Sequence, residues 1–80
     1  MVVNDNSVDS INSALKSICN NCELSCKVIR DNSVREINMA IQSIQRAAGI
    51  QSGLVTSNTV EAINTALLDL QRILRTRGYW

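Results

Sequence analysis

Residues 32–44 read NSVREINMAIQSI, and the same pattern occurs twice more in the chain. Residues 6–18 read NSVDSINSALKSI, and residues 58–70 read NTVEAINTALLDL. Both steps between copies have the same offset of 26 residues (32 − 6 and 58 − 32). A fixed period indicates one supersecondary unit used several times, with its apolar face buried against its neighbours. The sequence therefore predicts an internal triplication.

The tandem units tile most of the chain, and we predict a single helical domain over 1–80. The units are 1–26, 27–52 and 53–78. The composition agrees with a small globular domain, because 45 % of the residues are apolar, 19 % are charged and the mean hydropathy is +0.00. Disordered chains are poorer in aliphatic residues and richer in charge. The net charge of +1 is low for a general nucleic-acid coat.

Each copy begins with a helix start signal and continues with helical periodicity. Ser7, Ser33 and Thr59 are suited to be N-caps. Apolar residues then recur at alternating three- and four-residue spacing, which is typical of one buried helix face. The predicted core seam consists of Val8, Ile11, Leu15, Ile18, Val34, Ile37, Ile41, Ile44, Val60, Ile63, Leu67 and Leu70. The expected helices are 7–28, 33–48 and 58–76, the first of them the longest because its stripe continues to Ile29.

Two arrangements of these helices are compatible with the repeat. One is an antiparallel three-helix bundle, which short connections favour. The other is an array of co-directional helices with extended return segments, each lined by the apolar pair that precedes a copy. Those pairs are Val2-Val3, Val28-Ile29 and Leu54-Val55. We expect the antiparallel bundle, because a first helix that reaches residue 28 leaves only a tight turn at 30–32.

Three cysteines form a C-x-x-C-x-x-x-C pattern at Cys19, Cys22 and Cys26. On one helix these spacings would place the thiols on one face. The alternatives to core cysteines are a redox or disulfide role, with an intermolecular disulfide allowed by the odd number of cysteines, and a metal site. A closed zinc site needs four ligands, and the chain has no histidine. The matching residues of the second copy are Gln45, Ala48 and Ser52. We therefore predict cysteines that act mainly as small apolar residues, with no cofactor and no bound metal.

The end of the chain combines cations with its aromatic residues. These residues are Arg72, Arg75, Arg77, Tyr79 and Trp80. Tyr, Trp and Arg dominate interface hot spots, and guanidinium groups beside stacking aromatics also suit nucleic acids. Cations near a helix C-terminus offset its dipole, so a purely structural role is the plain alternative. We predict a partner-binding tail, with any nucleic-acid binding weak and salt-sensitive because three arginines neutralise few phosphates.

Asparagine is a mediocre helix former, yet it recurs at Asn12, Asn38 and Asn64 beside the seam. These side chains would either form hydrogen bonds that fix register or lie at a wet edge. A second column, Asn6, Asn32 and Asn58, precedes the caps and suits turn entry.

The function predicted from these features is structural. The chain has no histidine and only three glycines, and it contains no phosphate-binding glycine loop or catalytic triad, so an enzyme is not expected. Apolar residues beyond the seam and a weakly charged surface favour association. We expect an assembly or adaptor protein that packs against itself or a larger complex, such as a virion or phage particle. The alternatives are a small nucleic-acid-binding regulatory module and a cysteine-based metal or redox protein.

Location follows from the same features. A transmembrane helix needs about 20 consecutive apolar residues, and a signal peptide needs a charged region before an apolar one. The sequence shows neither pattern, so we expect a cytoplasmic protein or one enclosed within an assembled particle.

Overall fold

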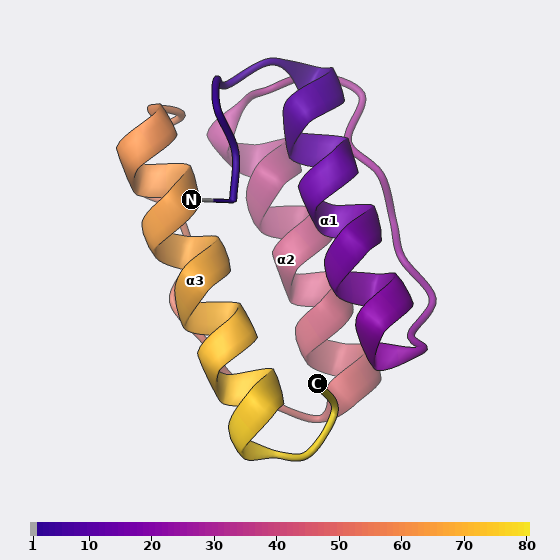
Figure 1. Cartoon of the computed structure of the whole chain (residues 1–80). Helices are drawn as coiled ribbons and strands as arrows, with labels where there is room; N and C mark the ends of the chain where they lie inside the picture. The colour runs from indigo at the N-terminus through magenta and orange to yellow at the C-terminus, as the bar shows by residue number, and fades with distance from the viewer. Residues whose placement is uncertain (1) are drawn as a thin grey trace.

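The computed structural model describes residues 2–80, and its regular elements are three α-helices packed around one core (Figure 1). They are α1 (Val8–Cys22), α2 (Val34–Ala48) and α3 (Val60–Thr76). The prediction of an all-helical three-helix bundle is confirmed. The expected bounds of the second and third helices agree with the observed ones to within two residues.

The expected antiparallel arrangement is wrong. Figure 1 shows all three helices running in the same direction, with segments 23–33 and 49–59 returning along the bundle between them. A 15-residue helix spans about 22 Å. An extended segment covers about 3.3 Å per residue, so each connection is long enough to return. The alternative of co-directional helices with extended return segments is the arrangement that forms.

The predicted length of the first helix is also wrong, because α1 ends at Cys22. Glu23 adopts a left-handed conformation (φ 55°), and the Leu24 N–H donates to the Cys19 carbonyl at 2.9 Å. This bond, from the second residue after the helix back to its last turn, is the mark of a Schellman motif. The apolar residue that suggested a longer helix, Ile29, is buried on the bundle from the return segment instead.

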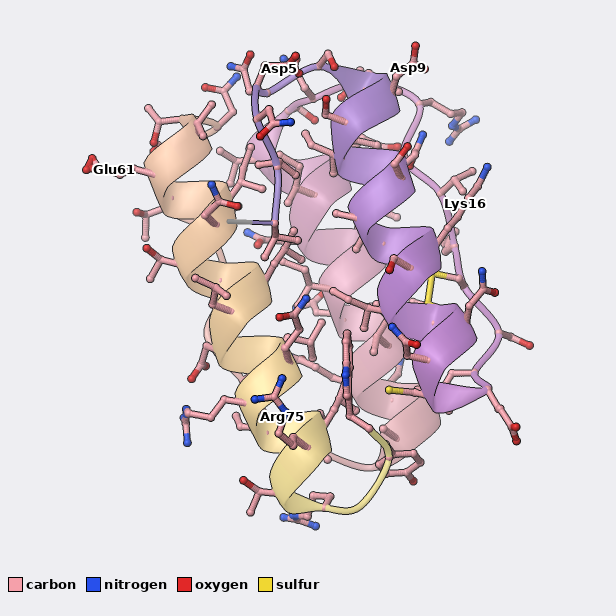
Figure 2. All side chains as sticks on the ribbon, in the orientation of Figure 1. Asp5, Asp9, Lys16, Glu61 and Arg75 are labelled. Carbon is pink, nitrogen blue, oxygen red and sulfur yellow. A yellow bond between two sulfur atoms is a disulfide. The ribbon has the colours of Figure 1, made fainter. Side chains whose placement is uncertain are left out.

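The helices begin as predicted. The Ser7, Ser33 and Thr59 side chains each accept a hydrogen bond from the backbone N–H three residues later, at 3.2 Å. Because the helices share one direction, these caps and the positive ends of all three dipoles lie together. Figure 2 shows Asp5, Asp9 and Glu61 at that end of the bundle. Negative side chains near helix N-termini offset the aligned dipoles.

The core is formed by the predicted seam, by further helix residues such as Leu74, and by buried residues of the extended segments, Ile50 among them. Val3, Ile29 and Val55 are buried, and they are the second members of the three apolar pairs. The seam residues inside the helices are fully buried, whereas Val8, Val34 and Val60 are only partly buried because they open the helices at the end of the bundle. The fully buried seam residues are Ile11, Leu15, Ile18, Ile37, Ile41, Ile44, Ile63, Leu67 and Leu70.

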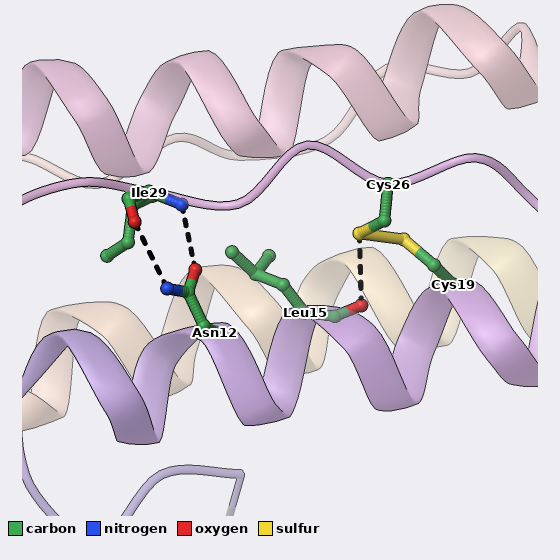
Figure 3. Close-up of a disulfide and its surroundings, with 5 residues drawn as sticks. All are labelled: Asn12, Leu15, Cys19, Cys26 and Ile29. Atoms are coloured by element: carbon green, nitrogen blue, oxygen red, sulfur yellow. Dashed lines mark hydrogen bonds between the residues drawn. A yellow bond between two sulfur atoms is a disulfide. The ribbon is translucent and has the colours of Figure 1, made fainter.

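The repeated asparagines attach each helix to an extended segment. Asn12 Nδ2 donates to the Ile29 carbonyl at 3.1 Å, and Asn12 Oδ1 accepts from the Ile29 N–H at 2.7 Å (Figure 3). Asn38 makes the same pair of bonds to Val55, at 3.0 and 2.8 Å. A primary amide can satisfy the N–H and the C=O of one residue at once. The asparagine amide therefore pairs with the backbone N–H and C=O of one residue, as a neighbouring strand does in a β-sheet.

The third asparagine closes the structure on itself. Asn64 is buried, and its amide bonds to Val3 with a donor distance of 3.1 Å and an acceptor distance of 2.8 Å. Figure 1 shows the start of the chain lying beside α3, so this segment takes the place that a third return segment would have. The contact Asn6 Nδ2 to Asn58 O, at 3.0 Å, supports the same closure. The repeats thus form a ring with approximate three-fold symmetry rather than an open array.

Candidate interaction surface

The residues predicted to bind partners do not form one patch. Arg72 pairs with Asp69 at 2.7 Å within α3, and Asp69 also accepts the Gly53 N–H at 2.8 Å. The Gly53 N–H, followed by the Arg72 guanidinium, lowers the pKa of Asp69 below its usual value. Arg72 is thereby engaged in holding a return segment against α3 through Asp69.

The aromatic residues after α3 turn back over the bundle. The Tyr79 N–H donates to the Leu74 carbonyl at 2.9 Å, after Gly78 adopts a positive φ of 85°. The Tyr79 hydroxyl donates to the carbonyl of Ala48, the last residue of α2, at 3.1 Å. Tyr79 therefore caps an orphan carbonyl at the C-terminal end of α2.

Trp80 and Arg75 are the members of the tail that share one surface. The Arg75 guanidinium lies 6.0 Å from the centroid of the Trp80 ring, a cation–π distance. Trp80 remains 40 % exposed. Arg75 lies near the C-terminal end of α3 (Figure 2). Arg77, the C-cap of α3, is exposed.

The exposed apolar surface lies mainly outside the predicted tail. Among residues 2–80, the large apolar side chains that stay exposed are Val28, Leu54, Leu68 and Trp80. Val28 and Leu54 are the first members of their apolar pairs, and they point outward because side chains alternate along an extended segment. The candidate site residues named from the sequence did not include them. The signal that could have found them is the apolar pair repeated at the 26-residue offset, read as an extended segment.

Each extended segment leaves a shallow groove beside the helix that follows it. The α1 groove has Val2 on its rim and Ala14 on its helix wall. The α2 groove has Val28 and Ala40 in the same places, and the α3 groove has Leu54 and Ala66. These residues are related by the 26-residue offset of the repeat. The grooves are therefore three versions of one surface feature.

Two of the three cysteines form a disulfide, Cys19–Cys26, which links α1 to its return segment (Figure 3). Cys26 Sγ also lies 3.3 Å from the Leu15 carbonyl oxygen, a close contact in the oxidised pair because a disulfide sulfur carries no proton. Cys22 is free and buried, and burial raises the pKa of its thiol. The expectation of small apolar cysteines thus holds for Cys22 and fails for Cys19 and Cys26. Helical spacing placed all three on one helix, whereas Cys26 lies beyond its end.

Among residues 2–80, no group of three or more histidine, cysteine or acidic side chains is arranged to hold a metal ion. In the same part of the chain, no helix combines the length and the apolar character that crossing a membrane requires. No family model, curated protein or solved structure matches this chain.

Proposed function

We propose that this protein is a non-enzymatic assembly or adaptor protein that docks apolar side chains onto further copies of itself or onto a larger complex. The observation that carries the proposal is the set of large apolar side chains left outside a completed core. Val28, Leu54, Leu68 and Trp80 are between 40 and 49 % exposed, although the ring of repeats is already closed. Exposed apolar groups that the fold itself does not need favour contact with a partner.

The charge distribution supports association. The net charge is +1, and 19 % of the residues are charged. A net charge near zero does little to keep copies apart. The exposed positions of the helices carry serine, asparagine, threonine or glutamine as often as charged residues, and these uncharged side chains cost less to desolvate than lysine or glutamate.

The shifted carboxyl pKa values have structural causes. Asp5 and Asp31 have lowered pKa values because each accepts hydrogen bonds from the serine two residues later. The pKa of Asp69 is lowered because its carboxylate accepts the Gly53 N–H of a return segment and pairs with Arg72. These shifts are accounted for by capping and by attachment of loops, so they do not call for a catalytic role.

Sedimentation equilibrium over micromolar to millimolar concentrations tests the proposal. The expected result is reversible association that persists in high salt, because apolar contacts are strengthened rather than screened by salt. The triple variant Val28→Ser, Leu54→Ser, Leu68→Ser should weaken association, whereas Gln42→Ser, at the place of Leu68 in the second repeat, should leave it unchanged. A monomer at every concentration, or association that the triple variant and Gln42→Ser affect equally, would contradict self-assembly through these side chains.

The nucleic-acid alternative makes the opposite prediction about salt. Binding through arginines releases counterions and weakens steeply as salt rises. Arg72 is paired with Asp69 and Arg75 is stacked on Trp80, so the tail offers fewer free cations than its sequence suggests. Tight, salt-sensitive binding to a mixed-sequence oligonucleotide, lost in Arg75→Gln, would favour that alternative over the proposal.

A further inference from the structure

The three grooves are related by the repeat, and an aromatic side chain of this chain lines one of them. In the α1 groove, Trp80 lines the surface together with Val2, Ala14 and Leu68. Arg75 lies over the indole ring. An indole next to alanine and aliphatic side chains, with a guanidinium on its face, is a favourable amphipathic environment. The molecule itself therefore shows an indole beside the valine and alanine of one groove of this form, where it serves as part of the lining.

The α2 groove offers the same surroundings without a resident aromatic. Val28 and Ala40 stand where Val2 and Ala14 stand in the α1 groove, and Met39 replaces Ser13 beside them. A methionine thioether contacts aromatic rings favourably. Arg30 also lines this groove, and its side chain is 89 % exposed. Its backbone N–H donates to Glu36 Oε1 at 3.2 Å, whereas its guanidinium lies 4.0 Å from the same oxygen. Arg30 is therefore free to stack on a ring as Arg75 does.

The α3 groove is less suited to an aromatic ring. Its volume is about 200 Å³, compared with about 340 Å³ for the α2 groove. Thr65 replaces Met39 and offers no thioether to an aromatic ring. Both grooves are lined by one carboxylate, Glu36 in the α2 groove and Asp69 in the α3 groove, so the acidic residues do not distinguish them. Of the two grooves without a resident aromatic, the α2 groove is thus the better match.

We propose that the α2 groove binds Trp80 of a second copy of this chain. This inference rests on the proposed assembly function and names the contact by which copies associate. Trp80 is 40 % exposed in its own α1 groove, so its seating there is partial. Seating in a neighbour's α2 groove would cover more of the ring and add the contacts with Met39 and Arg30. The groove and the tail are different surfaces, so the contact is heterologous unless two copies exchange tails reciprocally.

The experiment uses Trp80 as its own probe, because it is the chain's single tryptophan. Trp80 emission is recorded on the full chain across the concentration range in which sedimentation shows association. The expected result is a shift to shorter wavelength and reduced quenching by acrylamide, with the same midpoint as the sedimentation curve. Emission that does not change while the protein associates would overturn this inference and leave the proposed assembly function intact.

Two matched variants locate the groove. Val28 and Leu54 occupy the same place in successive repeats and are 45 and 42 % exposed, so the two serine variants are matched in position and exposure. Val28→Ser should weaken the association that Trp80 reports by about tenfold, the effect of losing about 1.4 kcal/mol, and Leu54→Ser should not. Equal effects, or a larger effect of Leu54→Ser, would overturn the assignment to the α2 groove.

A binding measurement separates the two proposals. The Trp80→Ala variant, labelled with ¹⁵N, is titrated with the unlabelled peptide of residues 73–80. The amide signals of Val28, Met39 and Ala40 should shift, and those around Leu54 and Ala66 should not. Shifts at the α2 groove support the inference, and their absence contradicts it. A wild-type chain that is monomeric at all concentrations contradicts the assembly function as well.

Discussion

The ends of α1 and α2 occupy the same place in successive repeats, and different chemistry holds them. After α1, a disulfide joins Cys19 to Cys26 in the return segment, with Cα atoms 5.8 Å apart. After α2, Gln45 Nε2 donates to the hydroxyl of Ser52 at 2.7 Å and to its carbonyl at 3.0 Å. The two pairs are related by the 26-residue offset. Both repeats thus link the helix to its return segment at this place, the first through a disulfide and the second through hydrogen bonds.

The helix C-caps differ in a similar way. Both Glu23 and Gly49 adopt the left-handed conformation, with φ of 55° and 66°. Both are followed by a residue whose N–H returns to the last helical turn at 2.9 Å. Glycine adopts this conformation at no steric cost, whereas glutamate does so at a cost. The two repeats therefore share the left-handed cap conformation, although glycine adopts it at a lower steric cost than glutamate.

The largest expected effect tests what the two repeats share. Asn12→Ala and Asn38→Ala each remove two hydrogen bonds to the backbone of a return segment whose residue is buried. Each should reduce the free energy of unfolding by about 2–4 kcal/mol, because a buried N–H and C=O lose their partner. Urea denaturation measures the loss. A cost below about 1 kcal/mol at either site would mean that water replaces the amide without penalty.

The next effect tests what differs between the repeats. Cys26→Ser opens a short covalent loop and should cost about 2.5 kcal/mol, whereas Gln45→Ala, losing neutral hydrogen bonds, should cost about 1 kcal/mol. The double variant Cys19→Gln, Cys26→Ser places the pair of the second repeat in the first. It should recover part of the loss of Cys26→Ser in urea denaturation. No recovery would show that the two ends differ in backbone geometry as well as chemistry.

A smaller effect, with opposite signs, is expected at the caps. Glu23→Gly should stabilise the protein by about 0.5–1 kcal/mol, because glycine removes the cost of the left-handed conformation. Gly49→Ala should destabilise it by about 1 kcal/mol for the converse reason. Thermal denaturation compares the two variants with the wild type. If Glu23→Gly were destabilising, the glutamate side chain would have to contribute contacts that outweigh the backbone cost.

The smallest effect concerns pH and distinguishes the first two repeats from the third. The pKa values of Asp5 and Asp31 are lowered by the hydroxyl and then the backbone N–H of Ser7 and Ser33; Ser57 stands in the matching place of the third repeat. A carboxyl with a lowered folded pKa contributes stability that is present above its unfolded pKa, about 3.9, and is lost as pH falls through the folded value.

The double variant Asp5→Asn, Asp31→Asn should therefore show a flatter loss of stability below about pH 4 than the wild type. Urea midpoints measured across the acidic range check this. Ser57→Asp supplies the matched gain, because it restores the pattern in the third repeat and should steepen the acid dependence. Parallel pH profiles for all three proteins would contradict the assignment of these shifts to the serine contacts.

The sequence was informative where the controlling interactions are local. The N-caps at Ser7, Ser33 and Thr59 act within one turn, and the 3,4 spacing marks the buried face within a few turns. The bounds of α2 and α3 followed from such signals. The end of α1 did not, because the stripe that continues to Ile29 has the same spacing whether Ile29 belongs to the helix or to an extended segment packed on it.

The direction of the helices and the positions of the grooves could not be predicted from these local signals. The spacing of an amphipathic stripe is the same along a helix in either direction. Periodicity therefore does not predict whether neighbouring helices are parallel or antiparallel. Direction depends on amide pairs such as Asn12 with Ile29, 17 residues apart. It also depends on the closure of Asn64 onto Val3, 61 residues apart. The equal offsets of the repeat were the available signal, since units that are alike tend to be placed alike.

The sequence by itself determined the number of helices, where they begin and which face of each is apolar. It did so because caps and apolar spacing act on residues within a turn or two of each other. Only the tertiary structure decided the common direction of the helices, the ring closed by residues 2–6, the disulfide and the groove lined by Trp80. Each of them needs residues from separate segments to meet. A primary amide binds whichever backbone is brought against it, and only the packed core fixes which backbone that is.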